Sequence, residues 1–112
     1  MDTVPDGAFE ETEVTEGVYL AQLTTGERMS LQHVRMEPGA RVPDHDHHHE
    51  QAGFVYAGEL TFRLDGGEIT VEAGDTYHLA GDERHGAVNR GDEVALAVDV
   101  FGPSRPDPDW LD

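Results

Sequence analysis

The chain of 112 residues contains no cysteine, which excludes disulfide bonds, thiolate metal sites and cysteine nucleophiles. It also has no apolar run near the roughly 18 residues of a membrane-spanning helix. Its first residues, Met1 to Asp6, are polar and acidic, unlike a basic leader followed by an apolar stretch. We therefore expect an intracellular, cytoplasmic protein, and at this length one domain with a modest core.

Lysine is absent as well, and seven arginines oppose 24 acidic residues, giving a formal net charge of −17. Such a field repels nucleic acid and anionic membranes, so we expect neither as a partner. The acidic residues are dispersed rather than gathered in one block. This leaves two interpretations: a surface for a basic partner, or a surface suited to concentrated salt, where screening suppresses self-repulsion. We favour the second, a halophilic protein, which says nothing about the chemistry.

Helical periodicity is also missing, because no window of that period reaches the length of an ordinary helix. Short apolar or alternating runs are instead separated by Gly, Pro and Asp, which is typical of an all-β sandwich or barrel. Asp65-Gly66-Gly67 predicts a hairpin, and Pro43 suits the start of an edge strand. The expected strands cover residues 18–23, 29–36, 54–56, 60–64, 68–71, 75–79, 86–88 and 94–101.

Histidine is abundant and regularly spaced in two matched segments. They read Gly39-x5-His45-x-His47-x3-Gln51-x6-Gly58 and Gly74-x10-His85-x3-Asn89. Because His45 and His47 are two apart, both side chains leave the same face if this stretch is a strand. A metal needs imidazole nitrogens converging on one point at roughly 2.0–2.1 Å, and neighbouring strands can supply the other ligands. The sequence therefore predicts a metal site.

These segments resemble the two motifs of the cupin superfamily, Gly-x5-His-x-His-x3or4-Glu-x6-Gly and Gly-x5-Pro-x-Gly-x2-His-x3-Asn. Motif 1 covers about residues 39–58 and motif 2 about 74–89, and together they span residues 39–89, nearly half of the chain. The resemblance implies one cupin domain over residues 1–112, an all-β double-stranded β-helix or jelly-roll barrel, with 103–112 as a C-terminal surface extension. It also implies one divalent metal bound by His45, His47, Gln51 and His85. Nitrogen-rich ligation suits Ni, Zn, Fe or Mn, among which the sequence does not choose.

Three positions depart from the family patterns, and one of them bears on chemistry. Ala80 and Asp82 stand where the family has Pro and Gly, which affects only a turn. Gln51 stands where Glu is usual, and a neutral amide leaves the metal charge uncompensated, making a stronger Lewis acid. Glu50 is the alternative oxygen ligand if the register shifts by one, but its side chain should leave the opposite face from Gln51.

The remaining histidines have simpler interpretations. His47-His48-His49 could be a solvated run, and neither His48 nor His49 occupies a ligand position in the motif. Only one of those two can share a face with His47, and His49 is the better candidate for lining the site. We interpret His33 and His78 as structural, although His78 has the strand parity to point inward.

The C-terminal strand contains a carboxylate, Asp99, inside the most apolar run of the chain. Asp is unfavourable there unless it has a partner or a task. If it faces the interior, burial raises its pKa toward the range useful for acid–base catalysis. Arg105 follows a Gly-Pro turn, where its guanidinium could bind a substrate carboxylate. The structural alternatives are an Asp that caps a turn and an Arg paired with acidic residues of the tail.

This tail, Asp-Val-Phe-x-Pro-x-Arg-x-Asp, after a first motif that ends His-Glu-Gln, resembles the uronate-linearising cupins of pectin and alginate breakdown (KdgF). In that family a His3Gln metal site opens 4,5-unsaturated monouronates to open-chain keto sugars. The resemblance implies that Asp99 is the acid–base group, that Arg105 binds the uronate carboxylate and that Phe101 forms an apolar wall. Gly102 and Pro106 depart from the family pattern.

Two other functions stay open. A metal-dependent dioxygenase would need a redox-active metal and a larger apolar pocket, against which the low aromatic content of 7% weighs. A non-catalytic module that binds or senses a small molecule is the other. By analogy with small cupins that pair through an edge strand, we also expect a homodimer.

Overall fold

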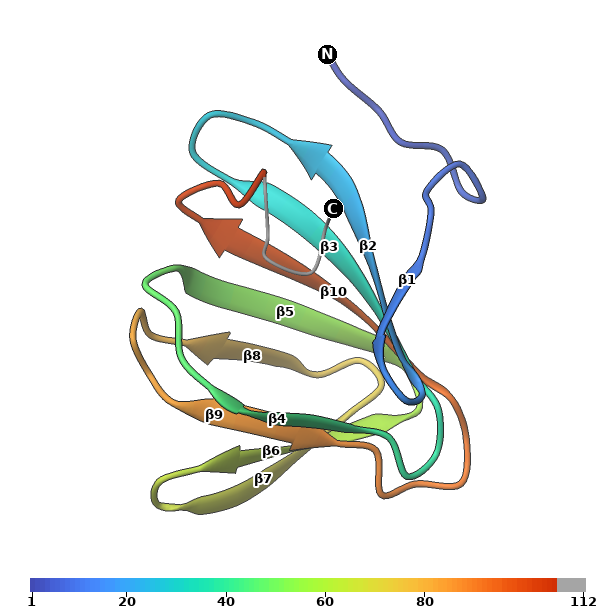
Figure 1. Cartoon of the computed structure of the whole chain (residues 1–112), viewed down its shortest axis with the longest axis vertical. Coiled ribbons are helices and arrows are strands. Elements are labelled where there is room, and N and C mark those ends of the chain that lie inside the picture. The colour runs from blue at the N-terminus through green and yellow to red at the C-terminus, as the bar shows by residue number, and fades with distance from the viewer. Residues whose placement is uncertain (107–112) are drawn as a thin grey trace.

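The computed structural model describes residues 1–106, which form ten β-strands in two antiparallel sheets (Figure 1). The six-stranded sheet has the order β1-β2-β3-β10-β5-β8 and the four-stranded sheet the order β4-β9-β6-β7. The bounds in the six-stranded sheet are β1 Thr12–Thr15, β2 Val18–Thr25, β3 Ser30–Met36, β10 Ala95–Gly102, β5 Glu50–Ala57 and β8 Thr76–Leu79. Those in the four-stranded sheet are β4 Arg41–His45, β9 His85–Val88, β6 Glu59–Leu64 and β7 Gly67–Glu72.

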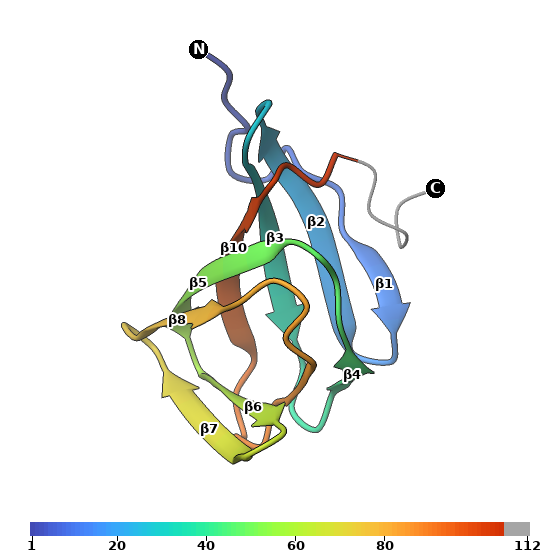
Figure 2. The ribbon, with the colours of Figure 1, turned by 90° about the vertical axis from the view of Figure 1, so that its left-hand side faces the viewer.

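The arrangement confirms the predicted all-β jelly roll. Strands distant in sequence are neighbours, since β10 lies between β3 and β5, and β9 between β4 and β6. Seen after a quarter turn, the strands of both sheets surround the middle of the molecule (Figure 2). Residues 1–106 contain no helix with the length and apolarity needed to cross a membrane.

Most of the predicted strands are present, with ends shifted by one to a few residues. The predicted hairpin at Asp65-Gly66-Gly67 joins β6 to β7, and Pro43 lies in β4, which is an edge strand as expected. Strand β1 was not predicted, because its sequence, Thr12–Thr15, is short and has no apolar face. Of the expected C-terminal extension, residues 103–106 follow β10 without regular structure, and 107–112 lie outside the described residues.

The burial of alternate residues follows from the two-residue period of a strand. In β5, Gln51, Gly53 and Val55 face inward, while Phe54 and Tyr56 lie on the outer face at 44% and 45% exposure. The inward apolar side chains form one core between the sheets, and burying each large aliphatic one stabilises the fold by roughly 1.5–3 kcal/mol. This core comprises Val18, Val34, Met36, Ala40, Val55, Leu60, Phe62, Val71, Leu79, Ala87, Ala95 and Ala97.

Two residues of the motifs, Gly58 and Asn89, stabilise the fold and do not line the cavity. Gly58 links β5 to β6 with φ of +70°, a left-handed conformation that favours glycine, and a side chain there would meet the carbonyl of Val94. Asn89 is fully buried, and its amide nitrogen lies 3.0 Å from the Met36 carbonyl and 2.8 Å from the Glu93 carbonyl. Both therefore fix the loops at the end of the barrel opposite the histidines.

The inner face of the six-stranded sheet divides into rows of different polarity. One row across β2, β3, β10, β5 and β8 is polar and consists, in register, of Gln22, Gln32, Asp99, Gly53 and Tyr77. Two residues along the strands, the equivalent row of Leu20, Val34, Ala97 and Val55 is apolar. The sheet therefore presents a polar end and an apolar floor to the space between the sheets.

Candidate metal centre and its cavity

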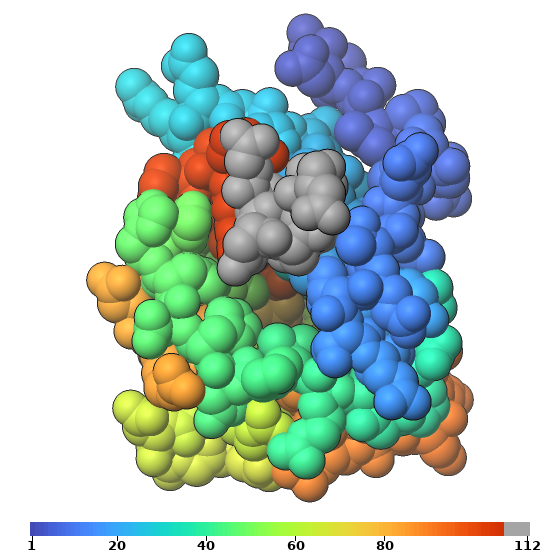
Figure 3. All heavy atoms as spheres, in the orientation of Figure 1, coloured from blue at the N-terminus to red at the C-terminus, as the bar shows by residue number. Residues whose placement is uncertain are grey.

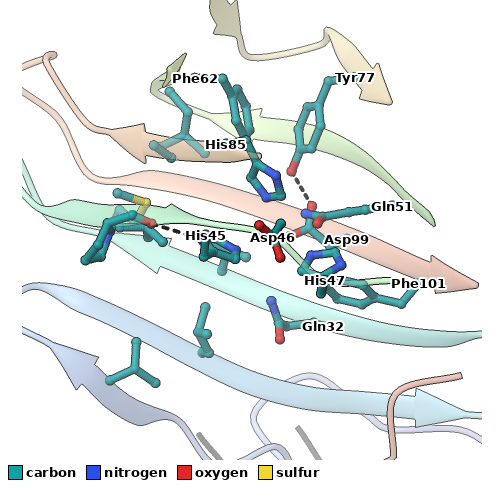
Figure 4. A pocket seen from close by; sticks show the side chains of 18 of the residues that line it. Gln32, His45, Asp46, His47, Gln51, Phe62, Tyr77, His85, Asp99 and Phe101 are labelled. Atoms are coloured by element: carbon teal, nitrogen blue, oxygen red, sulfur yellow. Dashed lines mark hydrogen bonds between the residues drawn. The ribbon is translucent and has the colours of Figure 1, made fainter. Parts of the chain in front are cut away.

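A cavity of about 370 Å³ lies between the sheets and is lined by residues of both. All six candidate site residues from the sequence line it: His45, His47, Gln51, His85, Asp99 and Arg105. Asp46, Phe62, Tyr77 and Gln32 also line it, and the close view shows these side chains converging (Figure 4). In the space-filling view the green atoms of β4, β5 and the loop between them lie on the face toward the viewer (Figure 3).

Three histidines form a cluster that could hold one metal ion. His45 ends β4, His85 begins β9, and the two residues are direct partners in the sheet. With His47 they offer ligand nitrogens that all lie within 4.8 Å of one another. This spacing suits imidazoles that surround one ion at roughly 2.0–2.1 Å each. The sequence had predicted this convergence of two segments that are far apart in the chain.

The route by which His47 reaches the cluster differs from the prediction. His45 and His47 do not share a strand, because β4 ends at His45 and His47 lies in the loop before β5. The chain must leave the four-stranded sheet here to join the six-stranded one, so the strand cannot continue. The loop is held by the His47 carbonyl, which accepts a 2.7 Å hydrogen bond from the Asp82 amide.

The hydrogen bonds of the three imidazoles leave the same nitrogen free for a metal. Each Nδ1 lies close to a backbone carbonyl oxygen: 2.9 Å for His45 to Pro43, 3.1 Å for His47 to His49 and 2.9 Å for His85 to Glu83. A carbonyl only accepts, so each Nδ1 carries the proton and each Nε2 has a lone pair. Within residues 1–106, the buried Nε2 of His47 has no hydrogen-bond partner. The cluster therefore fits a divalent metal.

Burial keeps two of these rings, those of His47 and His85, neutral, as metal ligation requires. Burial lowers the pKa of His47 to about 4, with smaller contributions from the positive charge of Arg105 and from the neighbouring histidines. Burial also lowers the pKa of His85, against an opposing hydrogen bond to the Glu83 backbone. Both imidazoles are therefore available as ligands at neutral pH.

Gln51 reaches the cavity from β5 and is buried at 7% exposure. Its side chain interacts by a hydrogen bond with Asp99, an interaction that lowers the Asp99 pKa. Because a carboxylate only accepts, the Gln51 amide nitrogen is the donor to Asp99, and this hydrogen bond does not use its carbonyl oxygen, which stays available as a ligand atom. Glu50 points to the opposite, exposed side, as predicted.

Asp99 faces the interior, as its functional interpretation required, and is 4% exposed. Burial raises its pKa to about 6, although hydrogen bonds from Tyr77 and Gln51 act in the opposite direction. The Tyr77 hydroxyl donates to Oδ1 of Asp99, and burial beside that carboxylate raises the pKa of the phenol. A carboxyl that can hold or release a proton near neutral pH thus lies beside the histidine cluster.

Sequence reasoning missed Tyr77, whose position depends on Gly53. Asp99, Gly53 and Tyr77 are partners in register across β10, β5 and β8. Because Gly53 has no side chain, the Tyr77 ring crosses over it and reaches Asp99; a Cβ at position 53 would overlap Cζ, Cε2 and the hydroxyl oxygen of Tyr77. A glycine inside a strand signals such a close approach, so this residue was the signal available.

Arg105 lies at the polar end of the cavity, with its guanidinium carbon 5.3 Å from the centre of the Phe101 ring. Two residues that the sequence did not reveal hold its backbone. The Arg105 amide donates to the Ser30 hydroxyl at 2.8 Å, and the Gln22 side-chain amide donates to the Arg105 carbonyl at 3.0 Å. The segment after β10 is thereby fixed over the cavity.

The other histidines lie outside the cavity lining. His33 is buried beside Tyr56, with its Nε2 2.5 Å from the phenol oxygen, which fits the structural interpretation. The inward parity expected of His78 is wrong: it is exposed and pairs with Glu50 at 2.6 Å. Its neighbours in β8 take the inward positions instead. The His49 ring packs edge-on against the His47 ring, with 5.4 Å between the ring centres, and does not line the cavity.

Comparisons with known proteins agree with this architecture. Residues 32–101 match the family model of the cupin domain. The chain is 28% identical over 96 residues to the pectin degradation protein KdgF of Dickeya dadantii, covering 85% of this chain and 86% of that protein. It is 31% identical over 67 residues to H2HPP isomerase of Bacillus subtilis, covering 60% of this chain but only 28% of that protein.

Among solved structures, KdgF from Halomonas sp. superimposes with a TM-score of 0.86 at 24% identity, covering 96% of this chain and 97% of that one. This likeness supports the fold. The match to the family model extends from β3 to β10 and includes the three histidines, Gln51 and Asp99. By these comparisons and by its fold, the chain belongs to the cupin domain family.

Proposed function

We propose that this cupin is a metal-dependent isomerase that opens the ring of 4,5-unsaturated monouronates and yields the keto form. The observation that carries the proposal is the buried carboxyl of Asp99, held beside the histidine cluster in a cavity that Arg105 also lines. The similarity to a pectin degradation protein over 85% of the chain supports this substrate class.

In this proposal His45, His47, His85 and the oxygen of Gln51 hold one divalent ion such as Ni, Zn, Fe or Mn. When bound, the ion supplies Lewis-acid polarisation of substrate oxygens. Arg105 binds the uronate carboxylate, because a guanidinium offers two parallel N–H donors to it. Phe101, which contacts both Arg105 and the His47 ring, forms the wall against which the sugar lies.

The reaction conserves all atoms and needs one group that moves a proton. The Asp99 carboxylate takes the proton of the C1 hydroxyl as the bond between C1 and the ring oxygen breaks and C1 becomes an aldehyde. The former ring oxygen leaves with the bonding electron pair as an enolate at C5, and its conversion to a ketone adds a proton to C4. Asp99 returns its proton at this stage, and such a placed acid–base group typically contributes ~10²–10⁴-fold.

A proton NMR time course tests this function. The metal-loaded protein in high salt is mixed with a 4,5-unsaturated monouronate, beside a chelated sample and an Asp99→Asn variant. We expect loss of the vinyl signal to be faster than in buffer and to return to the buffer rate in both controls. Loss at the buffer rate, with metal bound and the fold intact, would refute the proposal.

The apolar floor of the same cavity supports a second candidate, a metal-dependent dioxygenase for a substrate with an apolar group. Leu20, Val34 and Met36 of the six-stranded sheet and Leu60 of the opposite sheet line the cavity there, and a small polar sugar does not require them. An oxygen electrode distinguishes the two candidates, because isomerisation consumes no oxygen.

A further inference from the structure

Gln32, in the centre of β3, is a buried polar side chain that the proposed chemistry does not use. It is 6% exposed and lines the cavity. Within residues 1–106 its carboxamide makes no side-chain hydrogen bond. Its polar atoms are not among the fully buried ones that lack a partner, so they are open to the cavity. An amide that makes no hydrogen bond within the protein adds little to stability, so a position held only for stability would favour an apolar residue.

The other polar residues of the same row do have partners. The Gln22 amide nitrogen binds the Thr25 hydroxyl at 2.8 Å as well as the Arg105 carbonyl. Asp99, which is the partner of Gln32 in the register of β3 and β10, accepts hydrogen bonds from Tyr77 and Gln51. The missing partner of Gln32 is therefore specific to this side chain and is not a general property of this end of the barrel.

Gln32 also points to where a substrate would lie. Figure 4 shows its side chain rising from β3 toward the space between Asp46, His47 and Asp99, beside Phe101. A carboxamide both donates and accepts, which matches a hydroxyl group and matches a carboxylate less well. The carboxylate of a uronate is already assigned to Arg105 in the proposed function.

We propose that Gln32 binds a ring hydroxyl of the substrate and so determines specificity for hydroxylated sugar acids. This inference rests on the proposed function for the identity of the sugar. A 4,5-unsaturated monouronate has hydroxyls at C1, C2 and C3. The C1 hydroxyl gives its proton to Asp99 in the proposed reaction, which leaves the hydroxyls at C2 and C3 for Gln32. Its amide nitrogen donates to the oxygen of one of these hydroxyls, and its amide oxygen accepts the hydrogen bond of that hydroxyl.

The test compares Gln32→Leu with the wild type in both turnover and stability. We expect kcat/KM to fall roughly 10- to 100-fold, as for a lost hydrogen bond to substrate, while the melting temperature stays equal or rises because no hydrogen bond within the protein is lost. Gln22→Leu is the matched variant for stability. Its amide has partners, so its melting temperature should fall.

Substrate analogues sharpen the test. The wild type should discriminate against either the 2-deoxy or the 3-deoxy analogue of the monouronate, and Gln32→Leu should lose that discrimination, because the group that reads the hydroxyl is gone. Unchanged kcat/KM, or unchanged discrimination, in a variant that folds would overturn the role of Gln32.

If the proposed function is wrong, the wild type itself does not accelerate the reaction, which distinguishes this outcome from a failure of the role of Gln32 alone. The melting temperatures of the two variants then still test Gln32. A fall for Gln32→Leu as large as that for Gln22→Leu would show a structural amide and overturn the inference. A rise would keep Gln32 as a ligand-binding residue of another substrate.

Discussion

Replacing Asp99 by Asn should stabilise the metal-free protein at alkaline pH while abolishing turnover. The two side chains have nearly the same size, and the Asn oxygen can still accept from the Tyr77 hydroxyl. What changes is the charge, which burial penalises in the folded state. If this buried carboxylate weakens the fold and carries out the proposed proton transfer, the two effects should have opposite signs.

The magnitude follows from the pKa of Asp99, which burial raises from 3.8 to about 6. Because the folded state binds this proton more tightly, the carboxyl stabilises the fold fully below about pH 3.8, and this stability is lost as the pH rises through about 6. Each tenfold difference in proton affinity is worth about 1.4 kcal/mol. The ionised group therefore costs about 3 kcal/mol at pH 8 and about half of that at pH 5.

Urea unfolding of chelated wild type and Asp99→Asn at pH 8 and pH 5 measures this difference. Titration of the other acidic residues is shared by both proteins, so the difference between them isolates Asp99. We expect the variant to be more stable by up to about 3 kcal/mol at pH 8, with a smaller gain at pH 5. A less stable variant at pH 8, or a gain that does not shrink at pH 5, would refute the reasoning.

Three further predictions concern the support of the site, its metal and the outer surface. Gly53→Ala should lower the free energy of unfolding by roughly 1–3 kcal/mol through overpacking and should reduce turnover by displacing Tyr77. Gly66→Ala, with no atom within 4 Å of its new Cβ, is the control for melting temperature and rate. Equal effects of the two substitutions would contradict the steric explanation. His47→Ala should lower the metal content measured by mass spectrometry after dialysis, and wild-type content in this variant would exclude His47 as a ligand. Phe54→Asp should convert the expected homodimer to a monomer, as measured by light scattering. Phe54 lines an apolar groove on the outer face of the six-stranded sheet beside edge strand β8, where a second copy would pack. A monomeric wild type would refute the dimer.

The fold and the histidine cluster were accessible from the sequence because both depend on local spacing. Alternation within β5 and β10 places Gln51 and Asp99 inward, and two-residue periodicity is visible without any structure. His85 joins His45 through a motif whose spacing the family preserves. The halophilic source and the cytoplasmic location remain predictions.

The supporting residues were not accessible, since they depend on register between strands that are distant in the chain. Tyr77 acts on Asp99 only because β5 lies between β8 and β10 with Gly53 at the crossing point. The parity error for His78 has the same origin, because nothing in β8 alone indicates which alternate set of its side chains faces inward. Gln32 became notable only when its neighbours in the row were known.

The most direct test of the proposed chemistry is the stereochemistry of deuterium at C4 when the metal-loaded protein opens a 4,5-unsaturated monouronate in D2O. The C1 hydroxyl exchanges with D2O, so the hydrogen that the enolate receives at C4 is a deuteron. A carboxyl fixed on one side of the cavity, as Asp99 is, delivers it to one face. We predict a single monodeuterated diastereomer at early times, by NMR. An equal mixture of both diastereomers, formed faster than in buffer, would contradict proton delivery by Asp99.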